Sequence, residues 1–232
     1  MREAVALLTV LGGAATPSPR AWRWFPVVGA VVGALVGVCW WAASEAFAPL
    51  VAAALAMGAD LGLTGMLHVD GLADAADGLL GHGERADRLR IMRTPDIGAF
   101  AIGVVVTVLL VRFAALATQP VSVALVVALW CASRTVAAVV PAYVPYARDE
   151  GIASGMLPAA SAWPAVALVP VLAAIAFVDG TGGAVSVVGC ALAVVAIAAF
   201  AARRVGGFTG DVLGASIVVG ETVGLVVAAA HW

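Results

Sequence analysis

The sequence predicts an all-α protein, a polytopic bundle of about seven transmembrane helices with its N-terminus in the cytoplasm. Of its 232 residues, 63% are hydrophobic and only 11% are charged, whereas a soluble domain has about 25% charged residues. The apolar residues form runs of about the 20 residues that a bilayer crossing needs. The arginines gather in alternate connections between these runs. We therefore expect a multi-pass membrane protein with little room for a separate soluble domain.

Seven apolar runs are the predicted spans, and short polar turns alternate with longer polar connections between them. The first run contains Gly29, Gly33 and Gly37, a spacing typical of close helix packing in lipid. We expect a single integral-membrane domain over residues 1–232, in which 1–25 form an interfacial N-terminal segment. A cleaved signal peptide is the alternative for that segment. The predicted spans are 26–43, 46–66, 97–118, 121–144, 163–178, 183–202 and 212–230.

The arginines set the expected orientation. All 12 basic residues are Arg, and with a cytoplasmic N-terminus every arginine outside the spans falls on the cytoplasmic side, as the positive-inside rule requires. The three long polar connections, 67–96, 145–162 and 203–211, fall on the same side. We therefore expect any chemistry at the cytoplasmic face of a cell inner membrane. The net charge of −2 says little about partners, and we expect no nucleic-acid partner. The three cysteines lack the spacing of a disulfide or metal site.

An acidic triplet in the first long connection is the main candidate for chemistry. On a helix, Asp70, Asp74 and Asp77 lie at relative angles of about 0°, 40° and −20°, so the three carboxylates share one stripe. Like charges at these spacings destabilise a helix. A bound Mg²⁺ or Mn²⁺ together with a phosphate would relieve the repulsion. The alternative is a solvated acidic face neutralised by Arg85 and Arg88.

Two arginines and a histidine accompany the triplet. His68 could be a general base, a metal ligand or a hydrogen-bonded structural residue, and the sequence does not separate these roles. Arg93 and Arg148 could bind phosphate through the planar guanidinium group. For Arg93 the alternative is a positive-inside anchor. For Arg148 it is an ordinary charged turn beside the interfacial Tyr143 and Tyr146.

A glycine-rich turn before the last span is a further candidate site. Gly206, Gly207 and Thr209 could present backbone N–H groups to a bound anion. Asp211, directly after them, could add a metal ligand. Alone, a glycine-rich turn before a helix is weak evidence.

Four ionisable residues lie within the predicted spans, where charge is costly and usually functional. For Asp60 and Arg112, an internal ion pair is at least as good an explanation as a role in the site. Arg134 and Glu221 are predicted to reach the cavity of the site, Arg134 to bind substrate and Glu221 to ligate metal.

Taken together, these motifs resemble the cobalamin synthase family, the adenosylcobinamide-GDP ribazoletransferases. The matching segments follow the family's order over nearly the whole chain. After Ile91-Met92, family members commonly read Lys-Asp-Ser, and this chain instead has Arg93-Thr94-Pro95-Asp96. The segments that match are Gly62 to Leu79, Arg88, Ile91 to Arg93, Ile97-Gly98, Tyr146 to Gly151, Gly206 to Asp211, Gly214-Ala215 and Glu221.

The resemblance implies a Mg²⁺-dependent transferase. Its substrates would be adenosylcobinamide-GDP and α-ribazole or α-ribazole 5′-phosphate. The ribose 3′-hydroxyl would attack the phosphorus nearest the corrinoid arm, GMP would leave, and adenosylcobalamin or its 5′-phosphate would form. A homo-oligomer or a complex with other cobalamin-assembly enzymes is a further expectation.

In this reading each predicted residue has a role. The three aspartates of the triplet would hold Mg²⁺ against the diphosphate, with Asp211 completing the site. Arg93 and Arg148 would neutralise phosphate oxygens, and one carboxylate or His68 would take the hydroxyl proton. Two alternatives remain: a lipid enzyme like the CDP-alcohol phosphotransferases, and a divalent-cation transporter using Asp60, Asp70, Asp74 and Glu221.

Overall fold

The computed structural model describes residues 1–13, 16–157 and 161–230, and in those ranges the secondary structure is helical apart from one isolated β-bridge. Ala14 and Ala15 of the predicted N-terminal segment lie outside the described residues. The α-helices are α1 (Arg2–Leu8), α2 (Phe25–Ala46), α3 (Pro49–Thr64), α4 (Leu67–Leu80), α5 (Arg85–Ile91), α6 (Ala99–Thr118), α7 (Val123–Val139), α8 (Leu168–Val178), α9 (Gly180–Val205) and α10 (Gly210–Ala228). The 3₁₀ helices are η1 (Val10–Gly12), η2 (Pro19–Trp24), η3 (Val140–Ala142), η4 (Ile152–Met156) and η5 (Trp163–Ala167).

The helices confirm a polytopic helical membrane protein. Within the described residues, five helices are long and apolar enough to cross a membrane: η2 with α2, α6, α7 with η3, α9 and α10. The predicted span 46–66 passes this test only as the bent pair of α3 and α4, which would make a sixth crossing. The predicted span 163–178 is helical as η5 and α8, but it is shorter than the other five. By length and composition the structure thus supports five or six crossings, against about seven expected.

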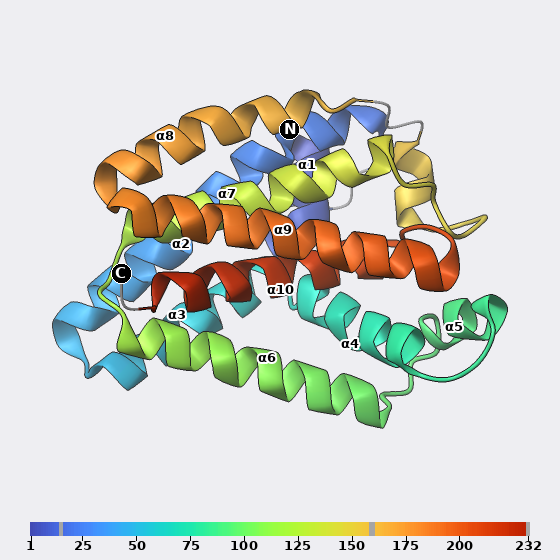
Figure 1. The fold of residues 1–232 in the computed structure, drawn as a ribbon, viewed down its shortest axis with the longest axis horizontal. Helices are drawn as coiled ribbons and strands as arrows, with labels where there is room; N and C mark the ends of the chain where they lie inside the picture. Colours follow the sequence, from blue (N-terminus) through green and yellow to red (C-terminus); the bar gives the residue numbers. More distant parts are fainter. Residues whose placement is uncertain (14–15, 158–160, 231–232) are drawn as a thin grey trace.

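The long and short connections lie at opposite ends of the bundle. Figure 1 shows the α4–α6, α7–α8 and α9–α10 connections at the right-hand end. The turns α2–α3, α6–α7 and α8–α9 lie at the left-hand end. The polar motifs of the long connections are therefore brought to one end of the molecule, as the alternation in the sequence predicts.

The glycine repeat of α2 is a helix-packing face. A Cβ at Gly29 would lie 2.4 Å from the carbonyl oxygen of Trp130, and one at Gly33 would lie 2.8 Å from the Trp130 Cβ. At Gly37 the nearest atom would be 3.1 Å away, on Val123. All three contacts are with α7, so the predicted role in close helix packing is confirmed.

A sharp bend separates α3 from α4 and sets the position of α4, the acidic helix that contains Asp70, Asp74 and Asp77. Gly65 and Met66 both have a φ of 59°, and α4 starts at an angle of 88° to α3. Met66 is the one non-glycine residue with positive φ in the described ranges. Such left-handed residues are costly outside glycine and persist where the surrounding structure requires them. Here the bend lets α4 pack along α10 towards the polar end of the bundle (Figure 1).

The N-terminal segment packs on the bundle through α1 and η2. Ala4 and Leu8 of α1 are buried, as is Trp22 of η2. Ser18 donates a hydrogen bond to Glu3, and the indole N–H of Trp22 donates to the carbonyl oxygen of Met156 at 3.0 Å. The segment is thus fixed both internally and to the α7–α8 connection. Its interfacial location stays a prediction.

Candidate active site

The crossing of α4 with the start of α10 brings two of the predicted motifs together. A Cβ at Gly71 would lie 2.9 Å from the carbonyl oxygen of Asp211. A Cβ at Gly214 would lie 3.3 Å from the Cα of His68. Both contacts need a residue without a side chain, because any larger residue would push the helices apart. Glycine on each helix therefore places the acidic triplet beside the glycine-rich turn.

A cavity of about 350 Å³ opens beside this crossing. This volume lies within the range of small-molecule sites. Four of the predicted site residues line it: His68, Asp70, Arg148 and Asp211. The remaining lining residues are Leu7, Leu8, Trp22, Phe25, Leu67, Gly71, Tyr146, Gly151, Met156, Gly210, Leu213, Gly214 and Ile217.

Arg148 is the cationic residue of this cavity. Its guanidinium nitrogen Nη2 lies 2.7 Å from a carboxylate oxygen of Asp211 and donates a longer hydrogen bond to the carbonyl of Met92 at 3.4 Å. Its Nε is buried and, within the described residues, has no hydrogen-bond partner. A buried N–H without a partner is costly, so this donor would gain from a ligand oxygen that reaches it. Burial raises the pKa of the neighbouring Tyr146, which keeps the phenol protonated at neutral pH.

The two loops that carry these residues are joined by a short parallel bridge. Tyr146 pairs with Phe208, and the backbone N–H of Ala147 donates to the Phe208 carbonyl at 2.8 Å. In return the N–H of Phe208 donates to the carbonyl of Pro145 at 2.9 Å. A Cβ at Gly207 would lie 2.2 Å from that carbonyl oxygen. Gly207 therefore allows the close approach that places Arg148 beside Asp211.

The other predicted residues of the glycine-rich turn end one helix and start the next. Gly206 follows the last residue of α9 with a φ of 78°, a left-handed conformation that favours glycine. The hydroxyl oxygen of Thr209 accepts a hydrogen bond from the N–H of Val212 and so caps α10. Gly206, Gly207 and Thr209 do not line the cavity, whereas the adjacent Gly210 does. Their contact with substrate stays a prediction.

The acidic triplet lies on one helix, but its members have different neighbours. Asp70 lines the cavity, and Asp74 lies within electrostatic range of Asp211, Asp70 and Arg148. Within the described residues, neither Asp70 nor Asp74 forms an ion pair, and no three His, Cys, Asp or Glu side chains are close enough to hold a metal by themselves. Carboxylates thus outnumber the cationic groups at this position.

Asp77, the third member, contacts the start of α6. One of its carboxylate oxygens accepts a hydrogen bond from the N–H of Gly98 at 2.6 Å, and the other accepts from Ala101 at 2.9 Å. The side chain therefore satisfies two unpaired N–H groups at a helix N-terminus, where negative charge is also favoured by the helix dipole. These contacts do not test the predicted role of Asp77 in metal binding, which stays a prediction.

The arginines near the triplet do not form ion pairs with it. Arg88 is buried and donates to the carbonyls of Gly78, Leu79 and Gly81 at the end of α4. Arg204 donates to Leu79 and Gly81 as well. Two cations therefore cap the negative C-terminus of the acidic helix.

Arg85 and Arg93 hold the α7–α8 connection. Arg85 donates to the carbonyl of Ala147 at 3.3 Å, and Arg93 donates to the carbonyl of Glu150 at 3.2 Å. The structure therefore shows no ion pair between the triplet and Arg85 or Arg88 within the described residues. The role of Arg93 towards phosphate stays a prediction.

His68 is buried at the wall of the cavity. Its exposed fraction is 6%, and within the described residues its ring forms no hydrogen bond. The structural explanation for this histidine therefore lacks the hydrogen-bond partner on which it depends. All three predicted roles, general base, metal ligand and structural residue, stay predictions.

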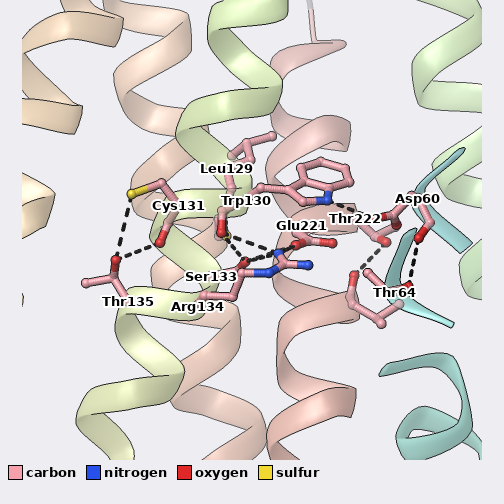
Figure 2. Close-up of polar contacts among 12 residues, drawn as sticks. Asp60, Thr64, Leu129, Trp130, Cys131, Ser133, Arg134, Thr135, Glu221 and Thr222 are labelled. Carbon is pink, nitrogen blue, oxygen red and sulfur yellow. Dashed lines mark hydrogen bonds and ion pairs between the residues drawn. The ribbon is translucent and has the colours of Figure 1, made fainter. Parts of the chain in front are cut away.

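Deeper in the bundle, a buried network joins α3, α6, α7 and α10 (Figure 2). Arg112 donates to Asp60 at 2.8 Å and to Glu221 at 2.7 Å. It also donates to the hydroxyl of Thr222 at 3.1 Å. The second oxygen of Asp60 accepts from the indole N–H of Trp130 at 2.9 Å. The internal ion pair expected for Asp60 and Arg112 is confirmed.

Arg134 and Glu221 belong to the same network. The second oxygen of Glu221 pairs with Arg134 and accepts from the hydroxyl of Ser133 at 3.0 Å. Both residues are 1% exposed, and neither lines the cavity. Two arginines thus balance two carboxylates, which satisfies the demand that buried charges be paired. The predicted roles of Arg134 towards substrate and of Glu221 towards metal stay predictions.

Several residues of the cavity were not singled out from the sequence. Leu7 and Leu8 of α1, Trp22, Phe25 and Met156 line it together with the polar residues. The available signal was the cluster of aromatic residues between Trp22 and Phe25, directly before the first span. It gave no indication that this segment lines the same cavity as α4, because that arrangement joins distant parts of the chain.

The fold and the cavity define a polytopic membrane enzyme with carboxylates and an arginine at the polar end of its helical bundle. The family model described as cobalamin-5-phosphate synthase matches residues 1–229, and the chain belongs to this family. Relatives named adenosylcobinamide-GDP ribazoletransferase include one from Ralstonia nicotianae, 40% identical over 209 residues, covering 84% of this chain and 78% of the relative. Another, from Bradyrhizobium diazoefficiens, is 36% identical over 243 residues, covering 99% and 93%. No solved structure gives a significant match.

Proposed function

We propose that this membrane enzyme is an adenosylcobinamide-GDP ribazoletransferase, with the cavity between α4, α10 and the N-terminal segment as its active site. The substrates are adenosylcobinamide-GDP and α-ribazole or its 5′-phosphate. The ribose hydroxyl oxygen forms a bond to the phosphorus next to the corrinoid arm, the bond from that phosphorus to the bridging oxygen breaks, and GMP leaves. Family membership excludes the CDP-alcohol phosphotransferase and transporter readings.

The main support for the proposal is that residues of three separate motifs line one cavity. Asp70 comes from α4, Arg148 from the α7–α8 connection and Asp211 from the start of α10. A diphosphate needs cationic donors for its oxygens, and Arg148 has a buried Nε without a partner. Phosphoryl transfer depends mainly on such positioning and charge stabilisation.

The donor chemistry of the cavity fits Mg²⁺. Mg²⁺ is usually held by one or two carboxylates together with substrate phosphates and waters, so a complete protein cage is not needed. Asp70, Asp74 and Asp211 would hold it, and their excess of negative charge supports this assignment. When bound, Mg²⁺ would neutralise charge on the phosphate oxygens.

The remaining polar residues have roles that follow from their positions. His68 would accept the hydroxyl proton, since the residue lines the cavity and its ring forms no hydrogen bond in the described part of the chain. Arg148 would bind a phosphate oxygen through its free Nε. The arginine-rich end of the bundle would face the cytoplasm by the positive-inside rule. Assembly as a homo-oligomer or with other cobalamin-assembly enzymes stays a prediction.

The test is GMP release by purified protein in lipid nanodiscs, with adenosylcobinamide-GDP and Mg²⁺ present. We expect release only when α-ribazole or its phosphate is added, and comparison of the two acceptors identifies the preferred one. Release that is equal without an acceptor, or absent with both, would overturn the proposal. For the metal, Asp74→Asn is expected to raise the Mg²⁺ concentration for half-maximal rate, whereas the control Glu84→Gln, an exposed acid at the same end, is not.

A further inference from the structure

The cavity has a second wall whose chemistry differs from that of the polar residues. It is formed largely by the N-terminal segment, which contributes Leu7 and Leu8 of α1, Trp22 of η2 and Phe25 at the start of α2. Met156 of the α7–α8 connection adds to it. We call these five residues the aromatic wall. No metal or phosphate contact can explain it, because its side chains offer no charged group.

Two rings make up the centre of the aromatic wall. The centroids of Trp22 and Phe25 are 4.8 Å apart, and the ring planes are tilted by 48°. The indole N–H, the one polar group of these rings, already donates to the carbonyl of Met156 at 3.0 Å. Both residues are 5% exposed. The wall therefore presents a fixed apolar surface with no hydrogen-bond donor left for a ligand.

We propose that the aromatic wall binds the aromatic base of the acceptor riboside, while the ribose and the phosphates lie at the polar residues of the same cavity. This inference rests on the proposed function and names the place of one of its two substrates. The base of α-ribazole is a dimethylbenzimidazole, which is planar and largely apolar, with one free ring nitrogen as its polar atom. Such a ring gains from contact with aromatic side chains in offset or tilted arrangements.

The donor nucleotide is a poorer occupant of the wall. Guanine has hydrogen-bond donors and acceptors along one edge, and burying them without partners is costly. With the Trp22 N–H occupied, the wall offers no group to satisfy them. A cavity of about 350 Å³ is also at the small end of ligand sites, so it suits a nucleoside-sized group, and the corrinoid ring would remain outside.

The test substitutes Phe25→Leu, which removes the ring but keeps an apolar side chain. We expect the KM for α-ribazole to rise about tenfold, as the loss of one aromatic contact implies. The kcat at saturating acceptor and the KM for adenosylcobinamide-GDP should stay unchanged. Phe177→Leu, which changes a 91% exposed phenylalanine of α8, is the matched control. Trp22→Phe, which keeps a ring, should give a smaller rise.

A second measurement uses ribosides of different bases. Wild-type protein should bind the dimethylbenzimidazole riboside more tightly than the unmethylated one in equilibrium dialysis, and Phe25→Leu should reduce this preference. A rise confined to the KM for adenosylcobinamide-GDP would assign the wall to guanine. No change in either KM, or riboside binding blocked by a lipid that copurifies with the protein, would overturn the inference. In each case acceptor-dependent GMP release by the wild type would leave the proposed function intact.

Discussion

The guanidinium of Arg148, in the α7–α8 connection, lies 2.7 Å from the carboxylate of Asp211, which follows the α9–α10 connection in the first turn of α10. The bridge between Tyr146 and Phe208 holds those connections together. One end of the Arg148 guanidinium is thus fixed while its Nε stays free. The contact with Asp211 holds the guanidinium at the cavity before substrate arrives, which reduces the cost of binding.

The first prediction concerns the geometry of this arginine. Arg148→Lys keeps the charge but loses the planar fork and the Nε donor. We expect kcat/KM for GMP release to fall by about 10- to 100-fold, the effect of losing one charge-assisted hydrogen bond. Arg203→Lys is the control, since Arg203 is exposed at the end of α9. Wild-type kcat/KM in Arg148→Lys would contradict the role of the fork.

The second prediction separates Asp77 from Asp74. Because Asp77 accepts from the N–H groups of Gly98 and Ala101, Asp77→Ala should lower the free energy of unfolding by about 1 kcal/mol, as for other helix caps. The expected readout is a lower midpoint of thermal unfolding, with an unchanged Mg²⁺ concentration for half-maximal rate. An Mg²⁺ dependence shifted as far as in Asp74→Asn would instead place Asp77 in the metal site.

The third prediction concerns the buried network. Arg112→Met leaves the carboxylates of Asp60 and Glu221 short of positive charge inside the bundle, and removal of one partner of a buried ion pair costs about 3–5 kcal/mol. We expect a large loss of thermal stability in detergent. The double variant with Asp60→Leu should recover part of it, because it removes one of the buried carboxylates left without its partner. Equal stability of the single variant and the wild type would show that the network is dispensable.

The fourth prediction tests the close approach of the two site loops. A methyl group at Gly207 would lie 2.2 Å from the Pro145 carbonyl oxygen, so Gly207→Ala should separate the loops and displace Arg148. A displacement of about 1 Å can lower the rate about 100-fold. Gly103→Ala, where nothing lies within 4 Å of the added methyl, should keep full activity. Similar rates of GMP release in both variants would refute the argument.

The fifth prediction tests the bend before α4. Gly65 has a φ of 59°, and an alanine in this conformation costs about 1–2 kcal/mol. Gly65→Ala should therefore lower the midpoint of thermal unfolding. Gly62→Ala, three positions earlier in α3 and with open space around it, should be neutral or slightly stabilising. The bend would not depend on glycine if both variants unfolded at the same temperature.

Local patterns decided which of the features were predictable from the sequence. Hydropathy located the helices that are long and apolar enough to cross a bilayer, since length and apolar character are properties of each segment alone. The spacing of Gly29, Gly33 and Gly37 predicted a packing face, and that face contacts α7. The helical angles of the acidic triplet also held, because α4 covers Leu67–Leu80.

Only the tertiary structure shows which charged residues lie at the cavity and which stabilise the fold. A helical wheel places Asp77 with Asp70, but it contains no information on the neighbouring helix whose N-terminus Asp77 contacts. Likewise, the sequence predicts substrate binding for both Arg148 and Arg134, and only the packing places Arg148 at the cavity and Arg134 in the buried network.

By itself, then, the sequence determined that this is a helical membrane protein with the motifs of its family, because these features depend on composition and on the local order of residues. The tertiary structure decided which motifs share a cavity. It also showed that the N-terminal segment, with Trp22 and Phe25, forms one wall of that cavity. The physical reason is that such contacts depend on the packing of segments far apart in the chain, where a bend at Gly65 and close approaches at Gly71 and Gly207 fix the geometry.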